Sequence, residues 1–70
     1  MFRPFTLADI YAYAADRGYS REDVEVRPYE YLDGTVTYTV EFGIEYTEMW
    51  SWEFDDLDGV ATDYEHLVWE

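Results

Sequence analysis

Apolar side chains in the first eighteen residues repeat with the spacing of one helix face. Four of them follow the i, i+3, i+4, i+7 pattern of a buried stripe: Leu7, Ile10, Tyr11 and Ala14. Thr6 is a suitable N-cap, and Asp9 stands at the capping-box position three residues later. Gly18 can adopt the left-handed conformation that ends many helices. The pattern therefore predicts a helix over residues 6–17.

In the middle of the chain, apolar residues recur at every second position, which is the spacing of a strand. Residues 24–32 (VEVRPYEYL) predict a strand, and the following Asp33-Gly34 pair is typical of a hairpin turn. Pro28 lacks an amide donor, which places this strand at a sheet edge. From residue 35 onward, apolar and polar side chains alternate through VTYTVEFGIEY and again through MWSWEF. A second turn separates these two runs, either near Gly43 or within residues 46–49.

The C-terminal third predicts a loop and a short helix. Residues 55–59 (DDLDG) are acidic and turn-like, whereas Tyr64, Leu67 and Val68 have helical spacing. The expected architecture is a single acidic α+β domain over residues 1–70, with the order α-β-β-β-α. It is a three-stranded antiparallel meander with an N-terminal helix and a short C-terminal helix packed on one face.

The opposite sheet face should then remain free of helices. Strand alternation assigns to this outer face a set of polar and tyrosine side chains: Glu25, Arg27, Tyr29, Tyr31, Thr37, Thr39, Glu41 and Glu53. Tyrosine gives rigid contact area with a polar tip, and such residues often anchor protein interfaces. Packing against neighbouring strands is the alternative role for these rings.

Charge narrows the possible partners. The chain has 17 acidic residues, four arginines and no lysine, so its net charge is −13. Direct binding to nucleic acid or to an anionic membrane needs a basic surface, and the sequence therefore argues against both. The 21% aromatic content argues against an acidic disordered chain. No apolar run is long enough to span a membrane, and the lack of cysteine fits a reducing cytoplasm.

The sequence offers little for catalysis. His66 is the only histidine and is expected at the surface near a helix end, and neither Ser20 nor Ser51 lies in a G-x-S-x-G motif. There is no lysine and no glycine-rich phosphate loop. We expect no enzymatic activity, no catalytic residue, no cofactor and no metal site.

A calcium loop is the one metal alternative. Residues 54–65 (FDDLDGVATDYE) match several positions of the EF-hand pattern. Phe54, however, occupies the first position, where a carboxylate is needed, and a strand precedes it where the motif has a helix. Calcium binding is accordingly the less favoured alternative.

The charge density suggests mimicry of a nucleic acid. Duplex DNA carries one charge per about 1.7 Å of axis, so 13 charges correspond to roughly 22 Å of duplex. A compact chain of this length has a diameter of roughly 28 Å, which is a similar scale. The candidate partner-binding residues are acids and tyrosines of the strands and of the acidic loop: Glu25, Tyr29, Glu30, Tyr31, Glu41, Glu45, Glu53, Asp55, Asp56 and Asp58. Adaptation to high salt is the competing explanation for so many acids.

The segments TLADIYAYAADRG and YEYLDGTVTYTVEF, with the charge, the size and the absence of cysteine, give the chain a resemblance to a class of inhibitors. The chain resembles the small acidic DNA-mimic proteins encoded by bacteriophages, which include anti-CRISPR proteins, uracil-DNA glycosylase inhibitors and anti-restriction proteins. Some type II anti-CRISPR inhibitors share the α-β-β-β-α order. By analogy with the glycosylase inhibitors, residues 24–32 would be an acidic edge strand, and Trp50 and Trp52 would line an apolar pocket for one enzyme side chain.

These observations lead to one functional expectation and one alternative of another class. The chain is expected to block the DNA- or RNA-binding groove of a nuclease, glycosylase or CRISPR effector, as a monomer or weak homodimer. Its partner would be a basic, nucleic-acid-binding protein of the host, in the host cytoplasm if a phage encodes the chain. The alternative is a structural module that forms homodimers through a sheet edge or an aromatic face.

Overall fold

The first helix forms where the sequence predicts it. The computed structural model describes residues 5–70, in which α1 spans Leu7–Asp16. The capping box is complete, because the Thr6 N–H donates to Asp9 Oδ2 (3.0 Å) and the Asp9 N–H donates to Thr6 Oγ1 (3.2 Å). Gly18 has φ +89° just beyond the helix end. A single 3-10 turn, η1 (Arg21–Asp23), then leads into the sheet.

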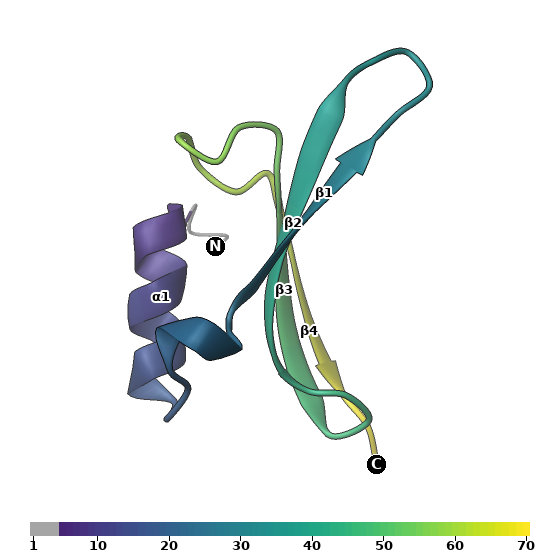
Figure 1. The fold of residues 1–70 in the computed structure, drawn as a ribbon. Helices are drawn as coiled ribbons and strands as arrows, with labels where there is room; N and C mark the ends of the chain where they lie inside the picture. The colour runs from purple at the N-terminus through teal and green to yellow at the C-terminus, as the bar shows by residue number, and fades with distance from the viewer. Residues whose placement is uncertain (1–4) are drawn as a thin grey trace.

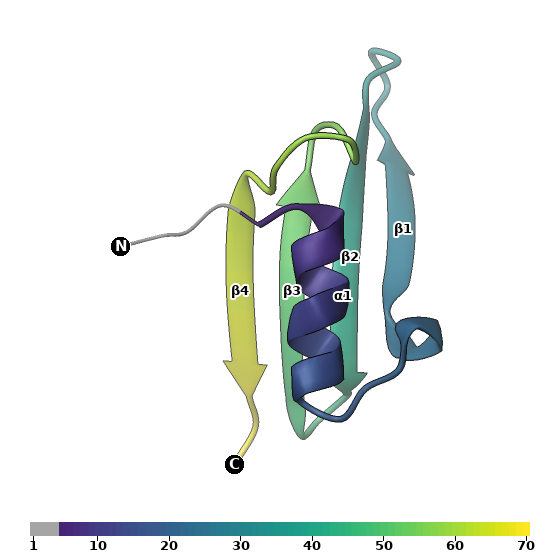
Figure 2. The same cartoon turned by 90° about the vertical axis from the view of Figure 1, so that its left-hand side faces the viewer.

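The sheet contains four antiparallel strands in sequence order, as Figures 1 and 2 show. They are β1 (Glu25–Glu30), β2 (Val36–Ile44), β3 (Glu48–Phe54) and β4 (Asp63–Val68). Helix α1 covers one face of this sheet, so that the described residues form two layers. Strand β1 lies at an edge, as Pro28 predicts.

The predicted three-stranded sheet and C-terminal helix are therefore wrong. Residues 63–68 form β4, which pairs with β3 in the register Trp52↔Tyr64, Trp50↔His66 and Glu48↔Val68. The segment fits the spacing of a helix and that of a strand, since Tyr64, His66 and Val68 also occupy alternate positions. A six-residue helix would be marginal in water, whereas strand pairing satisfies the free edge of β3 and adds ring contacts.

Those ring contacts place two β4 side chains beside the core. Tyr64 lies 5.1 Å from Trp52 between ring centroids, and the His66 ring stacks on Trp50 at 4.9 Å with an interplanar angle of 6°. His66 Nε2 is 2.7 Å from Glu48 Oε2. The histidine is thus partly exposed on a strand and does not stand at a helix end.

The second turn lies at residues 45–47 and overlaps the second of the two positions that the sequence left open, residues 46–49. The Thr47 N–H donates to Ile44 O (3.0 Å), and Tyr46 adopts φ +66°. Gly43 still belongs to β2 and pairs with Met49. It has φ +129°, and the β3 backbone approaches it so closely that a side chain would not fit.

The core lies between α1 and the central strands. Val40, Phe42, Trp50, Trp52 and Phe54 of the sheet are buried against Ile10 and Ala14 of the helix. Phe42 stacks on Trp50 at 5.0 Å, and Tyr13 meets the edge of Trp52 at 5.7 Å. The chain has no cysteine, and among the described residues four of the nine buried core side chains are aromatic: Phe42, Trp50, Trp52 and Phe54.

The turn between β1 and β2 depends on the ionised form of Asp33. Its Oδ1 accepts hydrogen bonds from the Thr35 N–H (3.0 Å) and from Thr35 Oγ1 (2.7 Å). The backbone bond, followed by the side-chain bond, holds the pKa of Asp33 below its ordinary value of 3.8. The carboxylate is fully exposed, and Gly34 next to it takes φ +90°.

We expect the stabilisation of the fold by the Asp33 carboxylate to be lost in acid. A group whose pKa is lower in the folded state stabilises the fold above its unfolded-state pKa and loses that contribution as the pH falls through the folded-state value. The wild-type chain should therefore be more stable than Asp33→Ala at neutral pH, and the difference should shrink below pH 3.8. Urea denaturation of both proteins across this range measures it; a constant difference would contradict the assignment.

Candidate partner-binding face

The sheet face opposite α1 is not covered by any other part of residues 5–70, and we call it the open face (Figure 1). Direct cross-strand pairs place its side chains in two neighbouring rows. One row runs Glu25, Glu41, Ser51, Glu65, and the next runs Arg27, Thr39, Glu53, Asp63. Tyr29 and Thr37 begin a third row. All eight side chains that the sequence assigns to the outer face lie on or next to it, with Tyr31 just beyond the end of β1.

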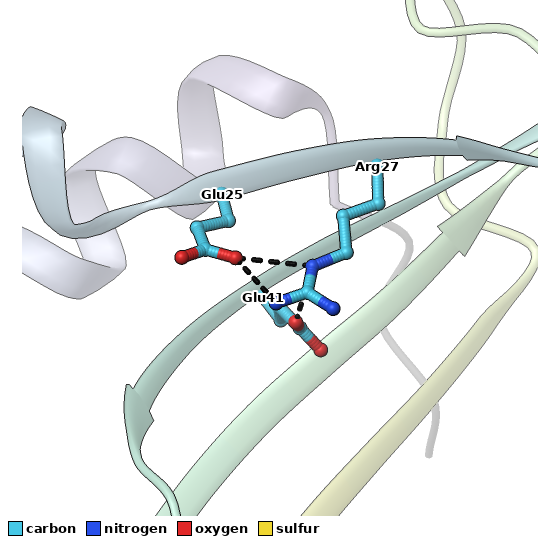
Figure 3. Close-up of polar contacts among 3 residues, drawn as sticks. All are labelled: Glu25, Arg27 and Glu41. Carbon is cyan, nitrogen blue, oxygen red and sulfur yellow. Dashed lines mark hydrogen bonds and ion pairs between the residues drawn. The ribbon is translucent and has the colours of Figure 1, made fainter.

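Arg27 is held between two glutamates at one side of this face, as Figure 3 shows. Its terminal nitrogen lies 2.6 Å from Glu25 Oε2, and its Nε lies 3.1 Å from Glu41 Oε1. The hydrogen bond to Glu25, together with the charges of Glu41 and Glu25, raises the pKa of Arg27 above its ordinary value. Arg27 is the only cation that the described residues place on the open face.

On the other side of the open face, every charged side chain of the described residues is acidic. Glu53 stands directly opposite Asp63, and Glu65 lies two residues further along β4. Within residues 5–70, none of these three carboxylates forms an ion pair. Like charges in directly opposed positions destabilise a sheet, so this arrangement favours an external cation. Asp63 and Glu65 were missed by sequence reasoning, because their segment was predicted to be helical.

Two exposed tyrosines border the acidic region. Tyr29 and Tyr31 meet edge to face with ring centroids 4.8 Å apart, and they are 61% and 46% exposed. Together with Thr37, Thr39 and Glu53 they line a hollow of about 300 Å³, which we call the tyrosine hollow. A smaller hollow of about 140 Å³ lies on the other side of Glu53, beside Ser51, Asp63 and Glu65.

The remaining candidate residues lie elsewhere. Glu30 pairs with Val36 and points to the helix side of the sheet, and Glu45 lies in the β2–β3 turn beyond the regular strand. Asp55, Asp56 and Asp58 belong to the loop between β3 and β4. This loop folds back towards the start of α1, where Ala61 N–H donates to Phe5 O (2.8 Å). The structure thus gathers Glu25, Tyr29, Tyr31, Glu41 and Glu53. It places Glu30 and the three aspartates elsewhere, whereas Glu45 lies in the turn, where its charge still acts on Arg27.

Trp50 and Trp52 cannot line a pocket for a partner side chain. They are 7% and 2% exposed and lie beneath α1 in the core. Alternation along β3 showed correctly that they share a face, but that face is the one that the helix covers. The apolar-pocket role suggested by analogy with glycosylase inhibitors is therefore not available to them.

The proposed calcium loop has strands on both sides. Residues 54–65 run from the end of β3 into β4, whereas the EF-hand pattern needs a helix on each flank. Asp56 Oδ1 accepts a hydrogen bond from the Asp58 N–H (2.9 Å), which is an ordinary turn contact. In the described part of the chain, no three metal-ligating side chains are grouped as a metal site.

Comparisons with known proteins gave no match: no family model, no curated protein and no solved structure is similar to the chain. Among residues 5–70, no helix has the length and apolar character that a membrane span requires. The functional argument consequently depends on the chemistry of the open face.

Proposed function

We propose that the chain is a nucleic-acid mimic that blocks the binding groove of a basic, nucleic-acid-binding protein through its open face. One observation carries this proposal: a sheet face without a helix bears the carboxylates of Glu25, Glu41, Glu53, Asp63 and Glu65 against a single arginine, with two exposed tyrosines alongside. A nuclease, glycosylase or CRISPR effector would offer the complementary arginine and lysine side chains.

The backbone fixes the spacing of these charges. Neighbouring strands lie about 4.7–4.9 Å apart, and alternate residues of one strand lie roughly 6.6–6.8 Å apart. The Cα atoms that carry these acids therefore form a grid whose backbone entropy has been lost on folding, so that binding has only the side-chain rotamers left to order. The described residues extend over 36 × 28 × 24 Å. Roughly 22 Å of duplex DNA carries 13 charges, so the domain spreads its net charge of −13 over a somewhat greater length.

The acids are not confined to the open face, but the two sides of the sheet differ. On the helix side the guanidinium of Arg17 lies 3.5 Å above the Tyr13 ring, and that of Arg21 lies 4.3 Å above Tyr11. Two of the three described arginines therefore offset negative charge on that side. The β3–β4 part of the open face has no cation from residues 5–70, and it is the surface that a basic partner would favour.

Capture from a bacterial lysate tests the proposal when duplex DNA is used as a competitor. The immobilised chain should retain proteins that bind nucleic acid, and prior addition of DNA should prevent their retention. The affinity of a retained protein should fall by about tenfold or more between about 50 mM and 200 mM salt, because screening weakens exposed charge pairs. Retention that is indifferent to DNA and to salt would refute mimicry.

A matched pair of variants assigns this binding to the open face. The triple substitution Glu53→Gln, Asp63→Asn, Glu65→Gln removes three charges from it and should weaken binding by at least about tenfold. The control Asp16→Asn, Glu22→Gln, Glu70→Gln removes the same charge elsewhere and should have a much smaller effect. Equal losses in the two variants would show that net charge alone is responsible.

An apolar patch favours the second candidate function, a homodimerising module. Ile44, Tyr46, Val68 and Trp69 are exposed near the C-terminal end of β4, and the rings of Tyr46 and Trp69 lie 5.8 Å apart. Two chains of charge −13 would need such an uncharged surface to associate. Sedimentation at several concentrations decides this, since a coefficient that stays at the value of a monomer at every concentration excludes the dimer.

A further inference from the structure

We propose that the tyrosine hollow is a binding site for the guanidinium group of an arginine side chain. The inference rests on the proposed function, because the arginine would belong to the basic partner, and it deepens that function by naming the group that is recognised. The hollow of about 300 Å³ is lined by Tyr29, Tyr31, Thr37, Thr39 and Glu53. These residues offer ring faces, hydroxyl oxygens and one carboxylate to a single occupant.

The lining suits a planar cation. Tyrosine faces attract guanidinium groups, and a carboxylate can accept two parallel N–H bonds from the same group. Tyr29 and Tyr31 meet edge to face (interplanar angle 66°), so the ring that presents its edge keeps both of its faces clear of the other ring. The hydroxyls of Thr37 and Thr39 are further acceptors for the remaining N–H groups.

The charges around the hollow favour a cation from outside the chain. Glu53 has no ion-pair partner among the described residues, and it stands opposite the like charge of Asp63. Arg27 lies on the same face, but its guanidinium is held by Glu25 and Glu41 (Figure 3). A bound arginine would offset the charge of Glu53 and relieve its repulsion from Asp63.

The chain itself contains both halves of the proposed interaction. Arg27 shows that carboxylates on this sheet face hold a guanidinium, with contacts of 2.6 and 3.0 Å to Glu25 Oε2. Arg17 and Arg21 show the second half, because each guanidinium lies over a tyrosine ring. The tyrosine hollow combines a carboxylate with tyrosine rings. Arginine should bind better than lysine, since a lysine ammonium is a compact point charge without a planar fork.

Titration of the isotope-labelled full chain with two blocked tripeptides, Gly-Arg-Gly and Gly-Lys-Gly, tests the inference by NMR. We expect the largest amide shifts at Thr37, Thr39 and Glu53, and an affinity for the arginine peptide at least about threefold higher than for the lysine peptide. Equal affinities, or shifts spread evenly over the acidic residues, would overturn the proposal.

Two variants and two controls locate the binding. Tyr29→Leu and Glu53→Gln should each weaken binding of the arginine peptide by about threefold or more. Tyr46→Leu removes a tyrosine that is 74% exposed in the β2–β3 turn, and Glu30→Gln removes a charge on the helix side of the sheet. Both controls should bind as the wild type does, and circular dichroism confirms that all four variants fold. Hollow variants that bind as tightly as the controls would exclude the site.

The outcomes separate this inference from the proposed function. The arginine peptide could bind selectively in the hollow while DNA leaves the lysate capture unchanged. That combination would support the arginine site and refute mimicry. DNA-sensitive capture that Tyr29→Leu and Glu53→Gln leave unchanged would support mimicry and refute the arginine site.

Discussion

Replacing Trp52 by alanine is expected to destabilise the domain by about 3–5 kcal/mol, the usual range for a large buried aromatic residue. The ring is 2% exposed and has Phe5, Tyr13, Phe42 and Tyr64 as neighbours, with centroid distances of 5.1 to 5.8 Å. These neighbours come from the segment before the helix and from α1, β2 and β4. Loss of this one ring therefore leaves a cavity where all parts of the core meet.

A domain of this size has little stability to lose. Free energies of unfolding of roughly 0.05–0.15 kcal/mol per residue give about 3.5–10 kcal/mol for the chain, so Trp52→Ala should be largely or wholly unfolded at moderate temperature. Urea denaturation followed by far-ultraviolet circular dichroism measures the loss. Trp69→Ala is the matched control, because Trp69 is 37% exposed beyond the end of β4. Similar losses in both variants would contradict the proposed core.

Alanine at position 43 should cost about 2–6 kcal/mol, through backbone strain of about 1–3 kcal/mol and overpacking of about 1–3 kcal/mol. Gly43 has φ +129°, where side chains are rarely tolerated. A Cβ atom there would meet the carbonyl oxygen of Glu48 and lie 2.7 Å from the Cα of Met49. Both are backbone atoms of β3 and cannot rotate away, so the β2–β3 hairpin would have to shift.

Gly34→Ala provides the comparison that isolates the close contact. Gly34 also has a left-handed φ of +90°, but a methyl group at this turn would have no atom within 4 Å beyond its own chain neighbours. The variant should therefore lose only about 1–2 kcal/mol, the cost of the left-handed conformation. Chemical denaturation of the two variants checks the difference, and amide hydrogen exchange should show the Gly43 effect in β2 and β3. Equal losses of unfolding free energy in the two variants would mean that the cost comes from the positive φ and not from the close contact with β3.

Local patterns decided what could be predicted. The helix was predictable because its cap, its apolar stripe and its terminal glycine all lie within eighteen residues. The Asp33-Gly34 turn set the pairing of β1 with β2, and so the cross-strand neighbours on the open face followed from alternation. Six residues near the C-terminus satisfy helical and strand periods alike, and only tertiary pairing with β3 decides between them.

That one error changed the candidate site. With a helix at residues 63–68, the acidic side of the open face would have ended at Glu53, and its opposition to Asp63 could not have been foreseen. The ion pairs of Arg27 with Glu25 and Glu41 depend on the register of β1 and β2, which the sequence implied. They also depend on side-chain rotamers, which the sequence did not imply. The burial of Trp50 and Trp52 followed from alternation, which put them on the face opposite Glu53; their role in an apolar pocket came only from the analogy with glycosylase inhibitors.

The two borders of the sheet are protected in different ways. Pro28 interrupts the donor row of β1, whereas no strand among residues 5–70 pairs with the outer side of β4, and β4 contains no proline. Charge repulsion opposes pairing of this edge with the same edge of another chain, since Asp63 and Glu65 are negatively charged in every molecule. That repulsion weakens as the pH approaches the isoelectric point near 4.1, so we expect association of chains through the outer edge of β4 to increase there.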